Sequence, residues 1–215
     1  MSVEDFMTKK VMTVVPDTKV NIAINTMSDN NIHRLPVIDN GKLVGIVTQR
    51  DIEKASPSEA TSLSIYEYNY LLNKMTVSDV MAKDVVTINS NQFLEDAIYQ
   101  MRTHQIGVLP VMDGDTVVGI ITNNDILDAF LDVTDYKEDA TVVQVFIEKD
   151  RTGVIYEVGK IMADNNFNIQ TMMVTHQGGT RVIEIHVDGE DGVSVAEKLQ
   201  AAGFTAKQAE HYKER

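Results

Sequence analysis

Cysteine is absent from the 215 residues of the sequence. A disulfide framework, a thiolate nucleophile and a thiolate metal site are therefore excluded. No stretch approaches the roughly 20 consecutive apolar residues that a membrane-spanning helix needs. The first residues, Met1–Asp5, have neither the basic start nor the apolar run of a signal peptide. From these absences we expect a cytoplasmic protein with no membrane partner.

Positive charge is also scarce. The chain has 19 Lys and Arg residues against 32 Asp and Glu residues, which gives a net charge of −13 at pH 7. Nucleic acids and anionic membrane surfaces are bound by clustered Lys and Arg side chains. The balance therefore argues against both kinds of partner, and solubility is its simplest consequence.

Catalytic and metal-binding motifs are lacking as well. The sequence has no Gly-x-Ser-x-Gly elbow, no Walker A loop and no His-Glu-x-x-His pair. Its histidines do not cluster at the spacing of metal ligands. We therefore expect no catalytic residue and no bound metal. A small hydrolase that uses Asp and His side chains remains an alternative.

One pattern is present twice, 74 residues apart (125 minus 51). A buried strand over 35–38 is followed by the turn sequence Asp39-Asn40-Gly41 and a return strand over 43–47. Thr48 and Asp51 then fit a capping box at the start of a helix. The second copy runs from Leu109 to Ile126 without a gap. Two copies are too few for a solenoid, so the pattern indicates a paired module.

A strand and a helix are expected before each hairpin. The strands are predicted over 11–15 and 85–88, where β-branched residues cluster. In the first unit Thr18 is the expected helix cap, and Asn30-Asn31 ends the helix. The last 75 residues or so have a different pattern, with strands over 142–147, 169–175, 182–187 and 204–211. One helix is expected from Val154 to its end at Asn165-Asn166, and a second over 193–201. The order β-α-β-β-α-β is that of a ferredoxin-like unit.

The expected fold class is therefore α+β, with mixed helices and strands. We place the first unit at 1–54, a linker at 55–74, the second unit at 75–132 and the ferredoxin-like domain at 138–215. Within the linker, an aromatic and aliphatic patch is expected to pack against the repeats or a twin subunit, or to form a ligand wall. It consists of Ile65, Tyr66, Tyr68, Tyr70, Leu71 and Leu72.

The two units resemble CBS domains, which occur as pairs called Bateman modules. The matching residues are Leu35-Pro36-Val37-x-Asp39 with Gly45-Ile46-Val47-Thr48-x-x-Asp51, and Leu109-Pro110-Val111-x-Asp113 with Gly119-Ile120-Ile121-Thr122-x-x-Asp125. The C-terminal segment resembles an ACT domain through Asp150-Arg151-Thr152-Gly153, where that family usually has Asp-Arg-Pro-Gly, and through Asn168-Ile169. The order CBS-CBS-ACT is similar to that of bacterial acetoin-utilization regulatory proteins.

The CBS resemblance implies an adenosine nucleotide, AMP, ADP or ATP, in a cleft between the repeats. Asp51 and Asp125 stand where the family holds ribose, and a carboxylate can accept both vicinal hydroxyl protons. His33-Arg34 match a pair that contacts phosphate in some members. Gly107-Val108 replace this pair in the second repeat, so the two clefts are unequal. Which cleft the pair serves is open, because it depends on how the repeats cross. The full set of expected nucleotide contacts is Thr13, His33, Arg34, Pro36, Thr48, Arg50, Asp51, Thr87, Gly107, Val108, Pro110, Thr122 and Asp125.

Several of these residues also have purely structural explanations. The Thr and Asp pairs can act as helix caps without any ligand, His33-Arg34 can be an exposed strand edge, and Pro36 and Pro110 can shape the backbone. The ACT resemblance implies an amino-acid site at Asp150, Gly153 and Asn168, although this domain can also serve only to dimerise the chain.

These observations predict a regulatory sensor, not an enzyme. Nucleotide binding to the CBS pair would be coupled to the ACT domain or to an unknown regulated protein, in acetoin or carbon metabolism. A homodimer is expected, since both module types resemble families that dimerise. The alternative is an adaptor or dimerisation protein with empty pockets.

Overall fold

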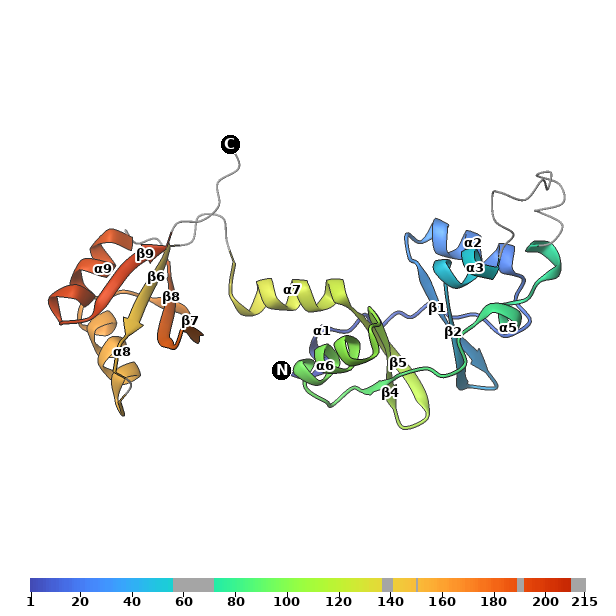
Figure 1. The fold of residues 1–215 in the computed structure, drawn as a ribbon, viewed down its shortest axis with the longest axis horizontal. Helices are drawn as coiled ribbons and strands as arrows, with labels where there is room; N and C mark the ends of the chain where they lie inside the picture. The colour runs from blue at the N-terminus through green and yellow to red at the C-terminus, as the bar shows by residue number, and fades with distance from the viewer. Residues whose placement is uncertain (56–71, 137–140, 150, 189–191, 210–215) are drawn as a thin grey trace. The chain divides into compact units, whose positions relative to one another are not determined.

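The computed structural model describes residues 1–55, 72–136, 141–149, 151–188 and 192–209 (Figure 1). Contacts between residues divide the chain into two compact units, Met1–Leu127 and Asp128–Arg215. Both units contain helices and strands, so the predicted α+β class is confirmed. No helix in the described ranges is both long and apolar enough to cross a membrane.

The first repeat is built around an antiparallel hairpin of β1 (Arg34–Asp39) and β2 (Lys42–Thr48). Asn40 and Gly41 have φ values of 47° and 80°, as the predicted tight turn requires. The helices of this repeat are α1 (Val3–Phe6), α2 (Val20–Asp29) and α3 (Gln49–Ala55). The apolar side of α2 packs on the hairpin in one core with Leu35, Val37 and Val47, all fully buried.

The second repeat has the same plan. Its hairpin pairs β4 (Val108–Asp113) with β5 (Thr116–Thr122), and Gly114 has a φ of 56° at the turn. The remaining elements are α5 (Val77–Val80), β3 (Ile88–Asn89), α6 (Leu94–His104) and α7 (Asn123–Val133), of which α7 continues into the second unit.

Two predicted strands are shorter than expected. The prediction over 11–15 was wrong, because only Val14 forms a parallel bridge, to Val37. The prediction over 85–88 was displaced, because β3 pairs only Ile88 and Asn89 with β4. β-Branched residues favour a strand, but each segment has a backbone partner at only one or two positions.

The predicted cap at Thr18 was also wrong. The Thr18 hydroxyl accepts a hydrogen bond from the Val15 amide at 3.2 Å and so closes a turn. The helix α2 begins at Val20 instead, after the extended residue Lys19.

The two repeats are interlocked within the first unit. The segment before the first repeat's helix reaches the second hairpin, where the backbones of Thr8 and Ile120 exchange hydrogen bonds of 2.9 and 3.0 Å. Ala82 and Ile46 form the equivalent pair in the opposite direction, at 2.9 and 3.0 Å. Each repeat therefore supplies a segment to the hairpin of the other.

Most of the predicted linker patch lies outside the described residues, because the structure describes nothing between 56 and 71. Its last member, Leu72, is 6% exposed and belongs to the core of the first repeat.

The second unit has the predicted β-α-β-β-α-β order. Its strands β6 (Thr141–Ile147), β7 (Ile169–Gln177), β8 (Thr180–Val187) and β9 (Thr205–Ala209) form an antiparallel sheet in the order β7-β8-β6-β9. The helices α8 (Val154–Asp164) and α9 (Gly192–Ala201) share a core with alternate residues of β6 and β8. The ferredoxin-like prediction is thus confirmed.

Candidate functional site

A cavity of about 280 Å³ lies in the first unit where three segments meet. One segment precedes the first repeat's helix, the second is the start of β1, and the third is the junction of β5 and α7. The lining residues are Thr8, Lys10, Val11, Met12, Asn31, Ile32, His33, Arg34, Pro36, Ile120, Thr122, Asn123, Asn124 and Asp125. The interlocking of the repeats creates this cavity, which we call the Asp125 cleft.

Asp125 is held by the first turn of α7. Its Oδ2 atom accepts hydrogen bonds from the Thr122 amide at 2.7 Å and from the Thr122 hydroxyl at 2.6 Å. Within the described residues, its Oδ1 atom has only a long contact of 3.4 Å, from the Thr8 hydroxyl. A carboxylate has about four acceptor positions, so Asp125 can cap the helix and still accept hydrogen bonds from a ligand.

Asp51 has the same local geometry in the first repeat. Its Oδ2 atom accepts from the Thr48 amide at 3.0 Å and from the Thr48 hydroxyl at 2.6 Å. Both predicted capping boxes are therefore confirmed. A structural role and a ligand contact remain compatible at each aspartate.

Arg34 reaches from the first repeat to the second. Its Nη1 atom donates a hydrogen bond to the carbonyl oxygen of Gly107 at 2.7 Å. The guanidinium is partly buried, and this desolvation lowers the pKa of Arg34 from its ordinary value. An arginine begins from so high a pKa that it keeps its charge at neutral pH. The cleft thus has a cation at one wall.

Lys10 is a second cation at the same cleft, and the sequence analysis missed it. It is exposed and lies among the lining residues together with His33 and Arg34. A comparison of the two repeats could have pointed to Lys10. The residue 74 positions later is Asp84, so the repeats carry opposite charges at this position. Of the residues that the structure describes, two permanent cations and one carboxylate therefore line the Asp125 cleft.

The structure brings together five of the predicted contacts, namely His33, Arg34, Pro36, Thr122 and Asp125. Thr13 lies just beyond the lining residue Met12, exposed to solvent. The other predicted residues do not line this cavity. They are Thr48, Arg50 and Asp51 around the start of α3, Thr87 before β3, and Gly107, Val108 and Pro110 at the start of β4.

A larger hollow, of about 450 Å³, lies beside α2 and α3 and shares Asn31, Ile32 and His33 with the Asp125 cleft. Glu53 is its carboxylate, and neither Lys nor Arg is among its described lining residues. This charge makes the hollow less suited to an anionic ligand than the Asp125 cleft, in spite of its size.

The predicted amino-acid site is only partly described. Gly153 precedes α8 and lines a hollow of about 140 Å³ together with Arg151, Tyr156 and Arg181. Asn168 is exposed before β7 and does not line it, and Asp150 lies outside the described residues. Arg151 forms an ion pair with Glu157, which lowers the pKa of the Glu157 carboxyl. Among the described residues, no three His, Asp or Glu side chains converge as a metal site requires.

Comparison with protein families matches the CBS domain to residues 3–58 and 77–132, which is more than half of the chain. The chain belongs to the CBS-domain proteins. The ACT domain matches residues 141–204, so a CBS pair is followed by an ACT domain, as the sequence predicted.

Two relatives match the CBS pair over most of their own length. A CBS domain-containing protein of Dictyostelium discoideum is 35% identical over 133 residues, which cover 61% of this chain and 92% of that protein. The CBS domain-containing protein YhcV of Bacillus subtilis is 34% identical over 125 residues, which cover 58% of this chain and 82% of that protein.

Solved structures also match this CBS pair. A candidate acetoin utilization protein (AcuB) from Vibrio cholerae has a TM-score of 0.53 and 32% identity over 63% of this chain and 93% of its own. CBSX2 in complex with AMP has a TM-score of 0.53 and 30% identity over 61% of this chain and 97% of its own. The CBS pair of MJ0100, in complex with 5′-methylthioadenosine and S-adenosyl-L-methionine, has a TM-score of 0.50 and 30% identity over 60% of this chain and 95% of its own.

Proposed function

We propose that this protein is a regulatory sensor whose CBS pair binds an adenosine nucleotide in the Asp125 cleft. The observation that carries the proposal is the placement of Asp125 in one cavity with Lys10 and Arg34. The complexes of CBSX2 with AMP and of the MJ0100 pair with adenosine derivatives support the ligand class.

Each part of a nucleotide has a suitable partner in the cleft. The Oδ1 atom of Asp125 can accept from a ribose hydroxyl, since Oδ2 is already used by the helix cap. Phosphate oxygens suit the guanidinium of Arg34 and the ammonium of Lys10. Val11, Met12 and Ile120 offer apolar surface to an adenine ring.

The repeat-related positions differ in charge, which favours one cleft for phosphate. Lys10, His33 and Arg34 correspond to Asp84, Gly107 and Val108, each 74 residues later. The second repeat therefore offers one acidic and two uncharged residues where the first repeat offers three basic side chains. Arg50 is the nearest compensating cation in the sequence. We expect phosphorylated ligands to prefer the Asp125 cleft.

The remaining parts of the proposal concern regulation. Nucleotide binding is coupled to the ACT domain or to a regulated partner, and this requires tighter binding to one arrangement of the chain than to another. The ACT domain takes an amino acid near Gly153 or dimerises the chain. The protein acts in the cytoplasm as a homodimer, without catalysis of its own, and the likeness to the Vibrio cholerae protein supports a place in acetoin metabolism.

The decisive experiment is calorimetric titration of wild type, Asp125→Ala and Asp51→Ala with AMP, ADP, ATP and adenosine. Both variants lose the same kind of helix cap, so Asp51→Ala is a matched control for the structural cost. We expect Asp125→Ala to weaken AMP binding about tenfold or more, as for a lost hydrogen bond to a charged group. Asp51→Ala should leave AMP affinity nearly unchanged.

The opposite ranking of the two variants would reject the choice of cleft. An absence of binding by wild type would reject the nucleotide sensor and favour the adaptor with empty pockets. Hydrolysis of the nucleotide would favour the enzyme alternative.

A further inference from the structure

The second unit contains a buried histidine that the proposed function does not use. His186 on β8 is 4% exposed, and neither ring nitrogen has a hydrogen-bond partner within the described part of the chain. Alternate residues of β8, Ile183, Ile185 and Val187, pack in the core with α8 and α9. Glu184 and His186 therefore face the other side of the sheet. Because buried polar side chains are normally hydrogen-bonded, the unpaired imidazole of His186 is suited to a polar ligand.

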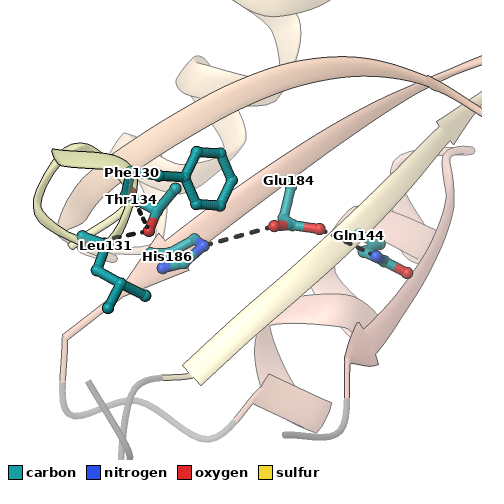
Figure 2. Close-up of polar contacts among 6 residues, drawn as sticks. All are labelled: Phe130, Leu131, Thr134, Gln144, Glu184 and His186. Carbon is teal, nitrogen blue, oxygen red and sulfur yellow. Dashed lines mark hydrogen bonds and ion pairs between the residues drawn. The ribbon is translucent and has the colours of Figure 1, made fainter. Parts of the chain in front are cut away.

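A hollow of about 250 Å³ lies on that side of the sheet. Most of its lining is apolar or aromatic, with Phe130, Leu131, Tyr136, Val142 and Met173. Figure 2 shows Phe130, Leu131 and Thr134 beside His186, with Glu184 on the same strand. The Thr134 hydroxyl already donates towards the carbonyl oxygens of Phe130 and Leu131, at 2.9 and 3.2 Å. It therefore has no proton left for the imidazole.

The separation between Glu184 and His186 leaves room for one further group. Glu184 Oε1 lies 3.6 Å from His186 Nε2, which is too far for a good hydrogen bond. The other carboxylate oxygen accepts from the Gln144 side chain at 3.0 Å. A nitrogen that carries several protons can lie about 2.9 Å from both Oε1 and Nε2 and donate to each. In this arrangement the Nδ1 atom of His186 carries the ring proton.

The charge of the hollow selects among possible ligands. Glu184 is its carboxylate, and no Lys or Arg is among its described lining residues. A carboxylate or phosphate would face Glu184 without a permanent counter-ion, whereas an ammonium would be attracted to it. The exposed ring of Phe130 adds an aromatic surface that suits a cation.

We propose that this hollow binds a small primary amine with an apolar body. The ammonium lies between Glu184 and His186, and the body packs against Phe130, Leu131 and Met173. The site is distinct from the hollow at Gly153, because the two share no lining residue. It does not depend on nucleotide binding to the CBS pair.

The test uses the full chain with ¹⁵N-labelled histidine, observed by NMR at mildly alkaline pH, where imidazole is neutral and an alkylamine is charged. The probes are 3-methylbutan-1-amine, 3-methylbutan-1-ol and 3-methylbutanoate, which share an apolar body and differ in the polar group. We expect the amine to shift the His186 ring resonances saturably. The alcohol should bind at least tenfold more weakly, and the anion should produce no shift.

Two variants separate this site from a general effect of charge. Glu184→Gln removes the negative charge and keeps an oxygen for Gln144, so it should fold and bind the amine at least tenfold more weakly. Glu197→Gln, at an exposed position of α9, is the matched control and should bind like wild type. Unshifted His186 resonances, equal binding of amine and alcohol, or full affinity in Glu184→Gln would each overturn the proposal.

Discussion

Arg34 and Gly107 are joined across 73 positions of the sequence by a hydrogen bond of 2.7 Å from the guanidinium to the carbonyl oxygen. Gly107 is the repeat counterpart of His33, so the bond links the two hairpins where each begins. A Cβ atom at Gly107 would lie 3.0 Å from the Asn123 side chain and 3.6 Å from Arg34. The small residue therefore permits the close approach. The basic group that the first repeat supplies is held in place by the second.

Arg34→Ala should weaken binding of AMP, ADP and ATP more than binding of adenosine. The expected loss is about 1–3 kcal/mol for a charged hydrogen bond to phosphate. Arg50→Ala, which removes a cation outside the Asp125 cleft, is the control and should have little effect on AMP. Titration calorimetry measures the affinities, and an equal loss for adenosine and its phosphates would contradict the role of Arg34.

Lys10→Ala should lower ADP affinity a few-fold and reduce its dependence on salt. An exposed cation contributes little at physiological ionic strength, since its field is screened within about 8 Å. The neighbouring Lys9 is also exposed but does not line the cleft, so Lys9→Ala is the matched control. The measurement is ADP affinity at several salt concentrations, and identical salt dependence in both variants would count against Lys10 as a phosphate contact.

Gly119→Ala should destabilise the first unit. A Cβ atom there would lie 2.3 Å from Met7 Sδ and 2.9 Å from Met7 Cγ. Such overpacking costs about 1–3 kcal/mol. Truncation of the methionine removes the clash, so the double variant with Met7→Ala should be more stable than the sum of the single effects predicts.

Gly45→Ala with Met81→Ala is a second double-mutant cycle, to be compared with the cycle of Gly119 and Met7. Its Cβ atom would meet Met81 Sδ at 2.5 Å but also the backbone oxygen of Ala82 at 3.0 Å. Met81→Ala should therefore relieve less of the cost, because a backbone atom cannot be truncated. Denaturant unfolding measures both cycles, and additive effects at Gly119 and Met7 would contradict the packing argument.

Asp79→Asn should lower the free energy of unfolding at neutral pH. The substitution should have little effect on that free energy in acid. The amide and the hydroxyl of Thr76 donate to Asp79 at 2.8 and 2.9 Å, and these bonds lower the pKa of Asp79 from its ordinary value of 3.8. A carboxyl whose pKa is lower in the folded state stabilises the fold at pH values above its ordinary pKa. This contribution disappears as the pH falls through the pKa of the folded state.

The measurement for Asp79 is the denaturant midpoint from neutral pH to below pH 3.8. The difference between wild type and Asp79→Asn should shrink over the acid part of that range. Asp115→Asn, at an exposed turn position, is the control. A difference that stays constant with pH would show that the capping box is not what Asp79 contributes.

Much of the fold could be predicted because it depends on short-range patterns. The turn at Asn40-Gly41 follows from residues that tolerate positive φ, and the capping boxes at Thr48 and Thr122 need partners only three residues away. The six elements of the ACT domain follow from alternation along strands and helical spacing between turns. The strands expected over 11–15 and 85–88 failed for the complementary reason, since a strand needs a partner that local sequence does not specify.

The candidate site was likewise predictable only in the features that depend on local sequence. The sequence by itself determined which residue types each repeat offers, including Arg34, Asp125 and the unequal charges of the two copies. Only the tertiary structure decided that Arg34, Asp125 and Lys10 line one cavity, and that His186 is buried beside Glu184. Those relationships depend on how separate segments cross and which face of a sheet is covered, because contacts between residues far apart in the chain are set by packing and not by local conformational preference.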